Sequence, residues 1–346
     1  MDSGTVIHRS QLKMDINGTL CLENGIPTIT SWPYRLAILI HIFLTFSSLV
    51  FMMVAFFYLR KRLYFHKNIT ILIVFMFVSA SVLSLQMLVM ECRHIFISWF
   101  YKHPCDVYVP AEDCFPYLLL NSVAIGCMTG AQVCMVIERM IATYLMKKYQ
   151  KFGGELGTIL VVCTTMIFVW LTYETFWPGP SEDYYLTCIS IPKESAVKAN
   201  RNFIILISLN LMCIISLILL NAINRPYRKR LRFNLADRYQ VEENLNTTQY
   251  ICTIVIVQFV ILTFYGTGTL LLRTFKAKFE PIFHRQLIMF VYVVPFFTCI
   301  LPILMIYIVK QGVERRNRNI NKMVSHAATG THGRDNYFHE LLKQWS

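Results

Sequence analysis

One charged pair in this sequence has the residue types and the position of a reversible ion pair. Glu138 and Arg139 are adjacent and stand at the end of a long apolar run. A guanidinium stays charged and binds a carboxylate through two parallel hydrogen bonds, so such a pair can hold a helix end and later release it. An ordinary interfacial ion pair that ends a helix is the alternative. A second charged motif, Arg238-Tyr239-Gln240-Val241-Glu242-Glu243-Asn244, suits a helical extension of a later run, and its Arg238 and Glu242 could equally form a plain surface pair.

The eleven cysteines suit disulfides better than a metal site. No CxxC and no paired Cys/His spacing occurs, so we predict no metal and no cofactor. Cys114 and Arg139 bracket one apolar run; at 1.5 Å per residue they lie roughly 37 Å apart, on opposite sides of a bilayer. Cys188 is the natural partner of Cys114, and a free thiol or a pairing with one of three other cysteines is the alternative: Cys21, Cys92 and Cys105.

Seven apolar runs must position these residues. The chain has 346 residues, of which 55% are hydrophobic and only 15% charged, whereas soluble domains carry about a quarter charged residues. A helix needs about 20 apolar residues to cross the hydrocarbon core of a bilayer. We therefore predict an all-α bundle of seven transmembrane helices, in the runs Leu36–Leu59, Ile69–Met90, Phe115–Ile141, Thr158–Phe176, Phe203–Ile223, Tyr250–Leu272 and Leu287–Val309.

The net charge of +13 is concentrated on one side of this bundle. If the N-terminus is outside, 21 of the 33 Lys and Arg residues fall in the cytoplasmic segments 59–68, 138–156, 224–249 and 310–346. Basic residues favour the cytoplasmic side, so we predict an outside N-terminus, although the last outer loop, Arg273 to Arg285, holds four basic residues. The charge is then explained by the lipid bilayer and does not require nucleic acid.

This orientation predicts on which side of the membrane each part of the chain lies and which asparagine carries a glycan. Residues 1–33 form an extracellular N-terminus, 34–309 the transmembrane domain and 310–346 a cytoplasmic tail, whose start is either a short basic helix on the membrane or unstructured. Three N-x-S/T sequons occur, at Asn17, Asn68 and Asn246, and only Asn17 would face the lumen and carry a glycan.

A small set of polar residues on the spans suggests a ligand pocket. Asn121, Tyr265 and Tyr292 lie on the third, sixth and seventh runs, with many aromatic neighbours. The alternative is that each bonds helix to helix, at about 0.6 kcal/mol on average. The runs offer no strong countercharge in mid-membrane, so a neutral ligand is expected.

Taken in order, the spans and the two motifs resemble the nematode serpentine chemoreceptors. The sequence Glu138-Arg139-Met140-Ile141-Ala142-Thr143-Tyr144 and the motif from Arg238 to Asn244 look like the paired signatures of the Sra superfamily, which groups Sra, Srb, Srab and Sre, with a preference for Sre or Srab. The resemblance implies a G-protein-coupled receptor in the plasma membrane of sensory cilia that detects a small odorant or pheromone and signals to a heterotrimeric G protein. Glu138, Arg139, Arg238, Tyr239 and Glu243 would form the coupling switch, with Arg139 and Glu243 holding the resting state.

Several features depart from rhodopsin-like receptors and leave other classes to consider. The sixth run has no CWxP and the seventh no NPxxY, which puts the details of activation in doubt. A ligand-gated channel of the odorant-receptor kind also has seven spans but an inside N-terminus. The sequence lacks HExxH, GxSxG and Walker motifs, so we predict no catalytic residues and no enzyme activity.

Overall fold

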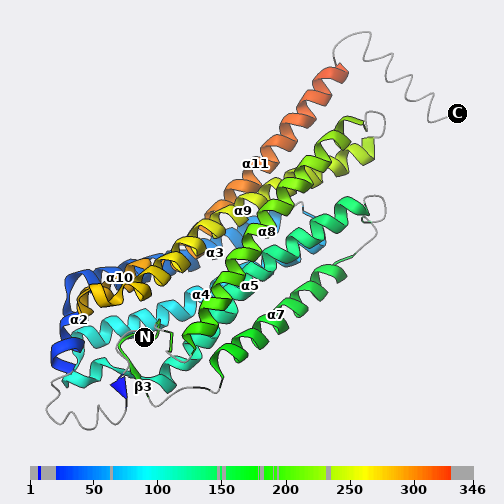
Figure 1. Cartoon of the computed structure of the whole chain (residues 1–346). Helices are drawn as coiled ribbons and strands as arrows, with labels where there is room; N and C mark the ends of the chain where they lie inside the picture. The colour runs from blue at the N-terminus through cyan, green and yellow to red at the C-terminus, as the bar shows by residue number, and fades with distance from the viewer. Residues whose placement is uncertain are drawn as a thin grey trace.

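A computed structural model describes residues 7–8, 21–62, 65–145, 149, 153–177, 179, 183–189, 191–192, 195–230 and 235–328, with only the backbone at some helix ends. Within these residues, seven helical spans are long and apolar enough to cross a membrane, which confirms the predicted bundle. The spans are α3 (Trp32–Arg62), α4 (Lys67–Phe100), α5 (Ala111–Tyr144), α7 (Glu155–Phe176), α8 (Ala196–Arg230), α9 (Leu235–Thr274) and the pair α10 (Pro281–Val291) with α11 (Val294–Ala328) (Figure 1).

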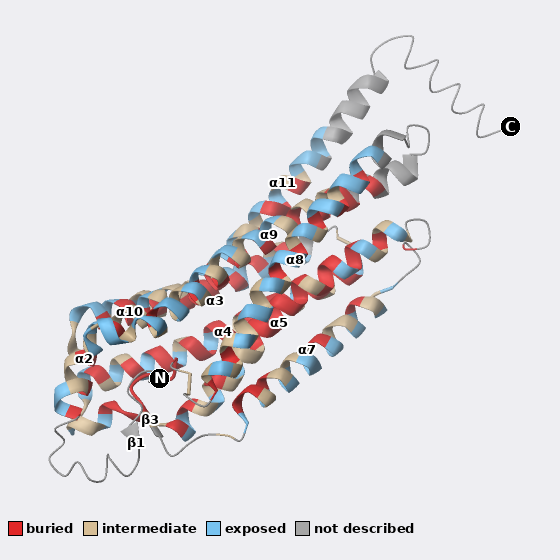
Figure 2. Cartoon of the chain, in the orientation of Figure 1, coloured by how far each residue is buried: buried red, intermediate tan, exposed pale blue. Residues whose placement is uncertain are grey.

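The bundle carries apolar side chains outside and polar side chains inside. Phe43 and Met166 are 69% and 67% exposed, as expected for side chains that face lipid. Gln132 of α5 and Gln258 of α9 are buried and hydrogen-bond each other at 2.5 Å, and Gln258 also donates to Thr129 at 2.8 Å. Figure 2 shows the buried residues gathered along α5 and the exposed ones on the outer faces of the other helices.

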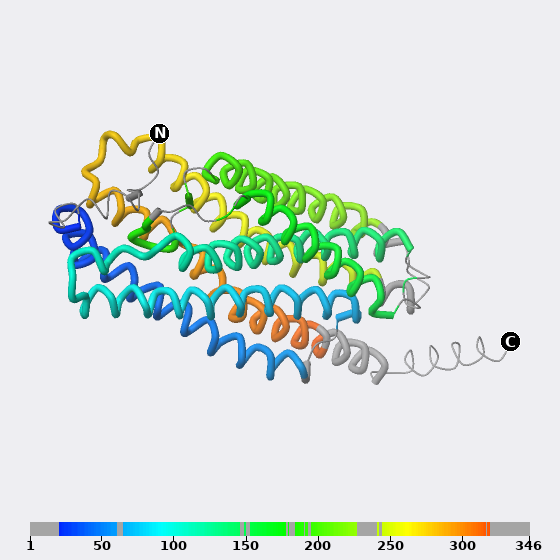
Figure 3. Tube along the Cα trace, turned by 90° about the horizontal axis from the view of Figure 1, so that it is seen from below, coloured from blue at the N-terminus to red at the C-terminus, as the bar shows by residue number. Residues whose placement is uncertain are grey.

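α5 lies at the centre of the bundle and packs against α4, α7, α8 and α9. α3 packs against α4 and α11 on one side, and α8 packs against α9 on the other (Figure 3). Gly126 and Gly130 let α7 approach α5 closely: a Cβ on either glycine would lie 2.3 Å from a side-chain atom of α7, on Phe168 or Thr164. This is the small-xxx-small packing of membrane helices.

The seventh span is broken after its first 11 residues, and a residue of α3 bonds a carbonyl that a proline further along leaves without its helical partner. α10 ends at Val291 and α11 begins at Val294, with the buried Tyr292 in the break. Pro302 cannot donate to the carbonyl of Thr298, and Ser48 of α3 donates to that oxygen instead, at 2.9 Å. Irregular backbone at membrane depth is tolerated where it is buried in protein.

Short elements cover one end of the bundle, which we call the disulfide end. They are η1 (Cys21–Gly25), α2 (Ile26–Thr30), η2 (Pro104–Val107), η3 (Lys276–Lys278) and an antiparallel sheet of order β1-β3-β2, from β1 (Ile7–His8), β2 (Val109–Pro110) and β3 (Asp183–Tyr185). One disulfide joins Cys114 to Cys188, the favoured pairing, and a second joins Cys21 to Cys105. The opposite end, where α5 carries Arg139, is the Arg139 end.

Every span is longer than the apolar run that predicted it, and three of the extensions change an expectation. α4 continues past Met90 to Phe100, and α9 begins at Leu235, which supplies the expected helical extension of the sixth span. α11 continues to Ala328 in one helix, so the tail does not begin with a separate helix on the membrane.

Candidate functional site

Arg139 is held at its end of the bundle by partners from two helices. Its Nε and Nη2 donate to the two carboxylate oxygens of Glu138 at 2.5 and 2.6 Å, and its Nη1 donates to Asn244 Oδ1 of α9 at 3.0 Å. All three side chains are buried. A buried ion pair needs such additional hydrogen bonds to offset the loss of water, so the arrangement joins α5 to α9 while Arg139 stays bound.

A second set of contacts joins Tyr149, which follows α5 in the chain, to the same carboxylate. The Tyr149 hydroxyl donates to Glu138 Oε1, accepts from Asn68 Nδ2 at 3.2 Å and lies 3.1 Å from His66 Nδ1. Asn68 in turn accepts the backbone N–H of Gly157 at 3.1 Å. The network therefore spans the starts of α4 and α7 as well as α5.

The predicted switch residues are only partly described. Glu138 and Arg139 form the expected ion pair, whereas the side chains of Arg238, Tyr239 and Glu243 lie outside the described part of the chain. The α9 partner of Arg139 is instead Asn244, the last residue of the motif that was noticed in the sequence. Tyr149 was missed, because it lies beyond the third apolar run, in a stretch where no motif was recognised.

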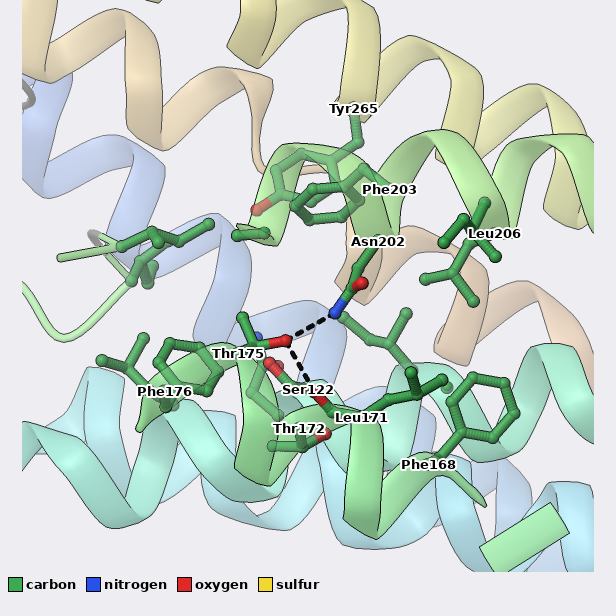
Figure 4. A pocket seen from close by; sticks show the side chains of 18 residues that line it. Ser122, Phe168, Leu171, Thr172, Thr175, Phe176, Asn202, Phe203, Leu206 and Tyr265 are labelled. Carbon is green, nitrogen blue, oxygen red and sulfur yellow. Dashed lines mark hydrogen bonds between the residues drawn. The ribbon is translucent and has the colours of Figure 1, made fainter. Parts of the chain in front are cut away.

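A cavity of about 70 Å³ lies between α5, α7, α8 and α9, towards the disulfide end (Figure 4). Its walls are mostly apolar, and none of the residues that line it is charged. The lining includes the polar side chains of Asn121, Ser122, Thr172, Thr175 and Asn202. An uncharged cavity of this size suits a compact neutral ligand and offers no countercharge to an amine or a carboxylate.

Hydrogen bonds fix how one polar group of this cavity is oriented. The Thr175 hydroxyl donates to the carbonyl of Leu171 at 2.6 Å, so its oxygen is left to accept, and Asn202 Nδ2 donates to it at 2.6 Å (Figure 4). Asn202 Oδ1 is then the free end of the amide, and it has no hydrogen-bond partner in the described part of the chain. An acceptor without a donor favours a ligand that brings a hydroxyl or N–H group.

The three residues predicted to form the pocket come together in space. Asn121 and Tyr265 line the cavity, and Tyr292 lies behind them: its hydroxyl donates to Asn121 Oδ1 at 3.1 Å, and its ring packs edge-on against Tyr265 at 5.2 Å. Tyr292 therefore does not line the cavity, but it links the cavity wall to the break in the seventh span. Four polar lining residues were missed: Ser122, Thr172, Thr175 and Asn202. A run that is apolar all round does not show which of its faces points into the bundle.

One buried carboxylate lies in a part of α4 that the predicted second span did not include. Glu91 was placed just beyond the second run, but α4 continues through it and its side chain is fully buried. His41 Nδ1 lies 3.2 Å from one carboxylate oxygen of Glu91, and His94 Nδ1 lies 3.9 Å from the other. Glu91 does not line the cavity, so the expectation of a neutral ligand remains a prediction.

No metal centre or glycan site can be assigned from the geometry. Among the described residues, no three His, Cys, Asp or Glu side chains are placed to hold a metal ion, and this includes the group around Glu91. Asn17 lies outside the described residues.

Comparison with known proteins gives one family and a set of nematode relatives. The family described as "Serpentine type 7TM GPCR chemoreceptor Sra" matches residues 18–345. Serpentine receptor class beta-17 of Caenorhabditis elegans is 25% identical, covering 98% of this chain and 94% of its own length. Serpentine receptor class alpha-10 of the same species is 27% identical over 92% of this chain and 94% of its own, and class alpha-7 is 22% identical over 83% and 88%.

Proposed function

The chain belongs to the Sra family of serpentine seven-transmembrane G-protein-coupled chemoreceptors, and on that premise we propose how it binds a chemical and signals. The superfamily resemblance is confirmed, but its preference for Sre or Srab is not, because the match is to Sra. Membership in this family also disfavours the ligand-gated channel. The ligand is a compact neutral odorant or pheromone, and the partner is a heterotrimeric G protein.

The uncharged cavity is the observation that carries the proposal. A ligand there contacts Asn121 and Tyr265, and both contact Tyr292 at the break between α10 and α11. A change at the cavity wall therefore reaches the break between α10 and α11, where the backbone of the seventh span has already lost helical hydrogen bonds. A ligand that binds better to a shifted arrangement of these helices favours that arrangement.

The Arg139 end is the proposed G-protein site. Arg139 is held by Glu138 on α5 and joins α5 to α9 through Asn244, so separating these helices requires Arg139 to leave Asn244. The structure corresponds on this proposal to the resting state, in which the switch formed by Glu138, Arg139, Arg238, Tyr239 and Glu243 is closed.

The orientation completes the proposal. The disulfide end faces outside, where disulfides persist, and the basic segments at the Arg139 end face the cytoplasm. Residues 1–33 are then extracellular, 34–309 form the transmembrane domain and 310–346 the tail. The receptor is placed in the plasma membrane of sensory cilia.

A larger side chain in the cavity wall tests whether the ligand binds in the cavity. Ala199 is buried and lines the cavity on α8, whereas Ala222 is exposed on the same helix. In calcium imaging against a panel of neutral and charged odorants, Ala199→Leu should reduce the potency of an active neutral compound at least about tenfold, a cost of about 1.4 kcal/mol. Ala222→Leu should leave potency unchanged at equal surface expression.

Two outcomes would overturn parts of the proposal. Equal potency in the Ala199→Leu and Ala222→Leu receptors would remove the cavity as the ligand site. A response that survives Arg139→Ala would argue against G-protein coupling at that end.

A further inference from the structure

A carboxylate is buried between two histidines in the half of the bundle nearer the disulfide end. Glu91 lies on α4 nine residues before the helix ends at Phe100, which is roughly 14 Å along the axis. Its side chain is 0% exposed, and the side chains of His41 and His94 are 4% and 5% exposed. An ionisable group at such depth is costly unless it is paired, and it marks a functional site by default.

Two facing atoms of this group lack a hydrogen bond that one added proton would allow them to form. His41 Nδ1 is within hydrogen-bond distance of Glu91 Oε1, at 3.2 Å. His94 Nδ1 and Glu91 Oε2 are 3.9 Å apart, and neither atom has a hydrogen-bond partner in the part of the chain that the structure describes. A proton on either atom would supply the donor that both lack, and a small side-chain movement would close the gap.

His41 and His94 are the ionisable side chains paired with the buried carboxylate. Tyr34 of α3 and Tyr292, in the break of the seventh span, interact with it electrostatically, and both stay neutral in this range. Arg285 of α10 acts on Tyr34 and keeps its charge, while its Nη1 donates to the carbonyl of Asn24 at 2.9 Å. His41 and His94 are left, and histidine is the side chain that titrates between pH 5 and 8.

Other charged groups at this end of α4 already have partners. Arg93 pairs with Asp113 of α5 at 2.9 Å, on the surface. Asp106 of η2 accepts the backbone N–H of His103 at 2.9 Å. Asp113 and Asp106 therefore do not compete with Glu91 as proton acceptors at this site.

We propose that His41, Glu91 and His94 form a proton-binding site, through which acid on the disulfide side of the membrane stabilises the resting receptor. The proton passes from hydronium to His94 Nδ1: an O–H bond of hydronium breaks, an N–H bond forms and donates to Glu91 Oε2, and water is released. The charge of the three side chains rises by one. The signalling consequence rests on the proposed function, whereas proton binding itself does not.

The site joins α3 to α4 through the contact between His41 and Glu91, and it is also connected to the ligand cavity. The His41 ring packs edge-on against Tyr292 at 5.8 Å, and the Tyr292 hydroxyl bonds Asn121 of the cavity wall. Protonation strengthens the bonds that hold this side of the cavity in its present arrangement. Acid on that side should therefore lower basal signalling.

Unfolding against pH tests proton binding without any signalling readout. Full-length receptor in lipid nanodiscs is unfolded by heat at pH values from 5.5 to 8, as wild type, His94→Gln, Glu91→Gln and His103→Gln. Above about pH 6.5, the ordinary histidine pKa of the unfolded chain, a folded wild type that binds one proton more than its unfolded chain has an unfolding constant that falls up to about tenfold for each unit that the pH is lowered. His94→Gln keeps the shape of the side chain and should lose this slope, whereas the loop control His103→Gln should keep it.

The decisive comparison does not depend on the survival of Glu91→Gln. Equal pH slopes in the wild type and His94→Gln would overturn the proposal. In cells, lowering only the external pH from 7.5 to 6 should reduce basal signalling of wild type and of His103→Gln but not of His94→Gln. Signalling that falls equally in all three, despite a lost slope in His94→Gln, would overturn the link to the resting state while leaving the proton site in place.

Discussion

Tyr149 donates a hydrogen bond to the Glu138 carboxylate that pairs with Arg139. Its hydroxyl donates to the Glu138 carboxylate while Asn68 donates to the same hydroxyl. A hydrogen bond to a charged group contributes about 1.5–3 kcal/mol, so Tyr149→Phe should raise basal signalling roughly tenfold or more, provided that the active state is rare. The measurement is recruitment of a G-protein probe without ligand, at matched surface expression.

An exposed tyrosine on the same stretch of chain serves as the control. Tyr144 is 88% exposed at the end of α5, so Tyr144→Phe should leave basal signalling unchanged. If Tyr149→Phe behaves like Tyr144→Phe, the hydroxyl does not restrain the switch.

Single residues could be predicted where their chemistry was distinctive, and not where their position depends on tertiary contacts. Glu138 with Arg139 was recognisable as an ion pair, and Asn121, Tyr265 and Tyr292 were recognisable as polar groups on apolar runs. Their common location follows from how α5, α9 and α11 cross, which the sequence does not state. Tyr149 lies beyond the third apolar run, so hydropathy gives no sign of its position in the bundle.

The packing of α5 against α7 depends on two glycines. A Cβ on Gly130 would lie 2.3 Å from Thr164 Cγ2 and 2.6 Å from the ring of Phe168. Gly130→Ala should therefore push the helices apart or force side chains off their rotamers, at a cost of about 1–3 kcal/mol. The expected result is a lower unfolding temperature of the purified receptor.

The chain provides both a control and a rescue for this helix contact. A Cβ on Gly153 meets nothing within 4 Å, so Gly153→Ala should be nearly neutral. Thr164→Ser removes the clashing methyl but keeps the hydroxyl that lies 3.0 Å from Cys134 Sγ, and it should restore part of the lost stability. Failure of Thr164→Ser to improve on Gly130→Ala would show that this methyl is not the obstacle.

Helices were predicted from hydropathy, and their ends were missed where polar residues are satisfied inside the bundle. The second run was ended at Met90 because Glu91 is charged, yet α4 continues for ten more residues to Phe100 with Glu91 paired to His41. The break at Tyr292 was not placed either. Pro295 marks it only loosely, because proline is also tolerated in the first turn of a helix.

The orientation of the whole molecule gives the last prediction, since every proposed role depends on it. The disulfide with Cys105 fixes Cys21 at the disulfide end, and Asn17 precedes Cys21 by four residues in the sequence. Asn68 lies at the other end, is 0% exposed and donates to Tyr149, so its amide is not free to carry a sugar. With the disulfide end outside, glycosidase treatment should reduce the apparent mass of the receptor from cells, and Asn17→Gln should abolish that change. Asn246→Gln should leave it intact. A mass change that depends on Asn246 and not on Asn17 would place the Arg139 end outside, and the G-protein site with it.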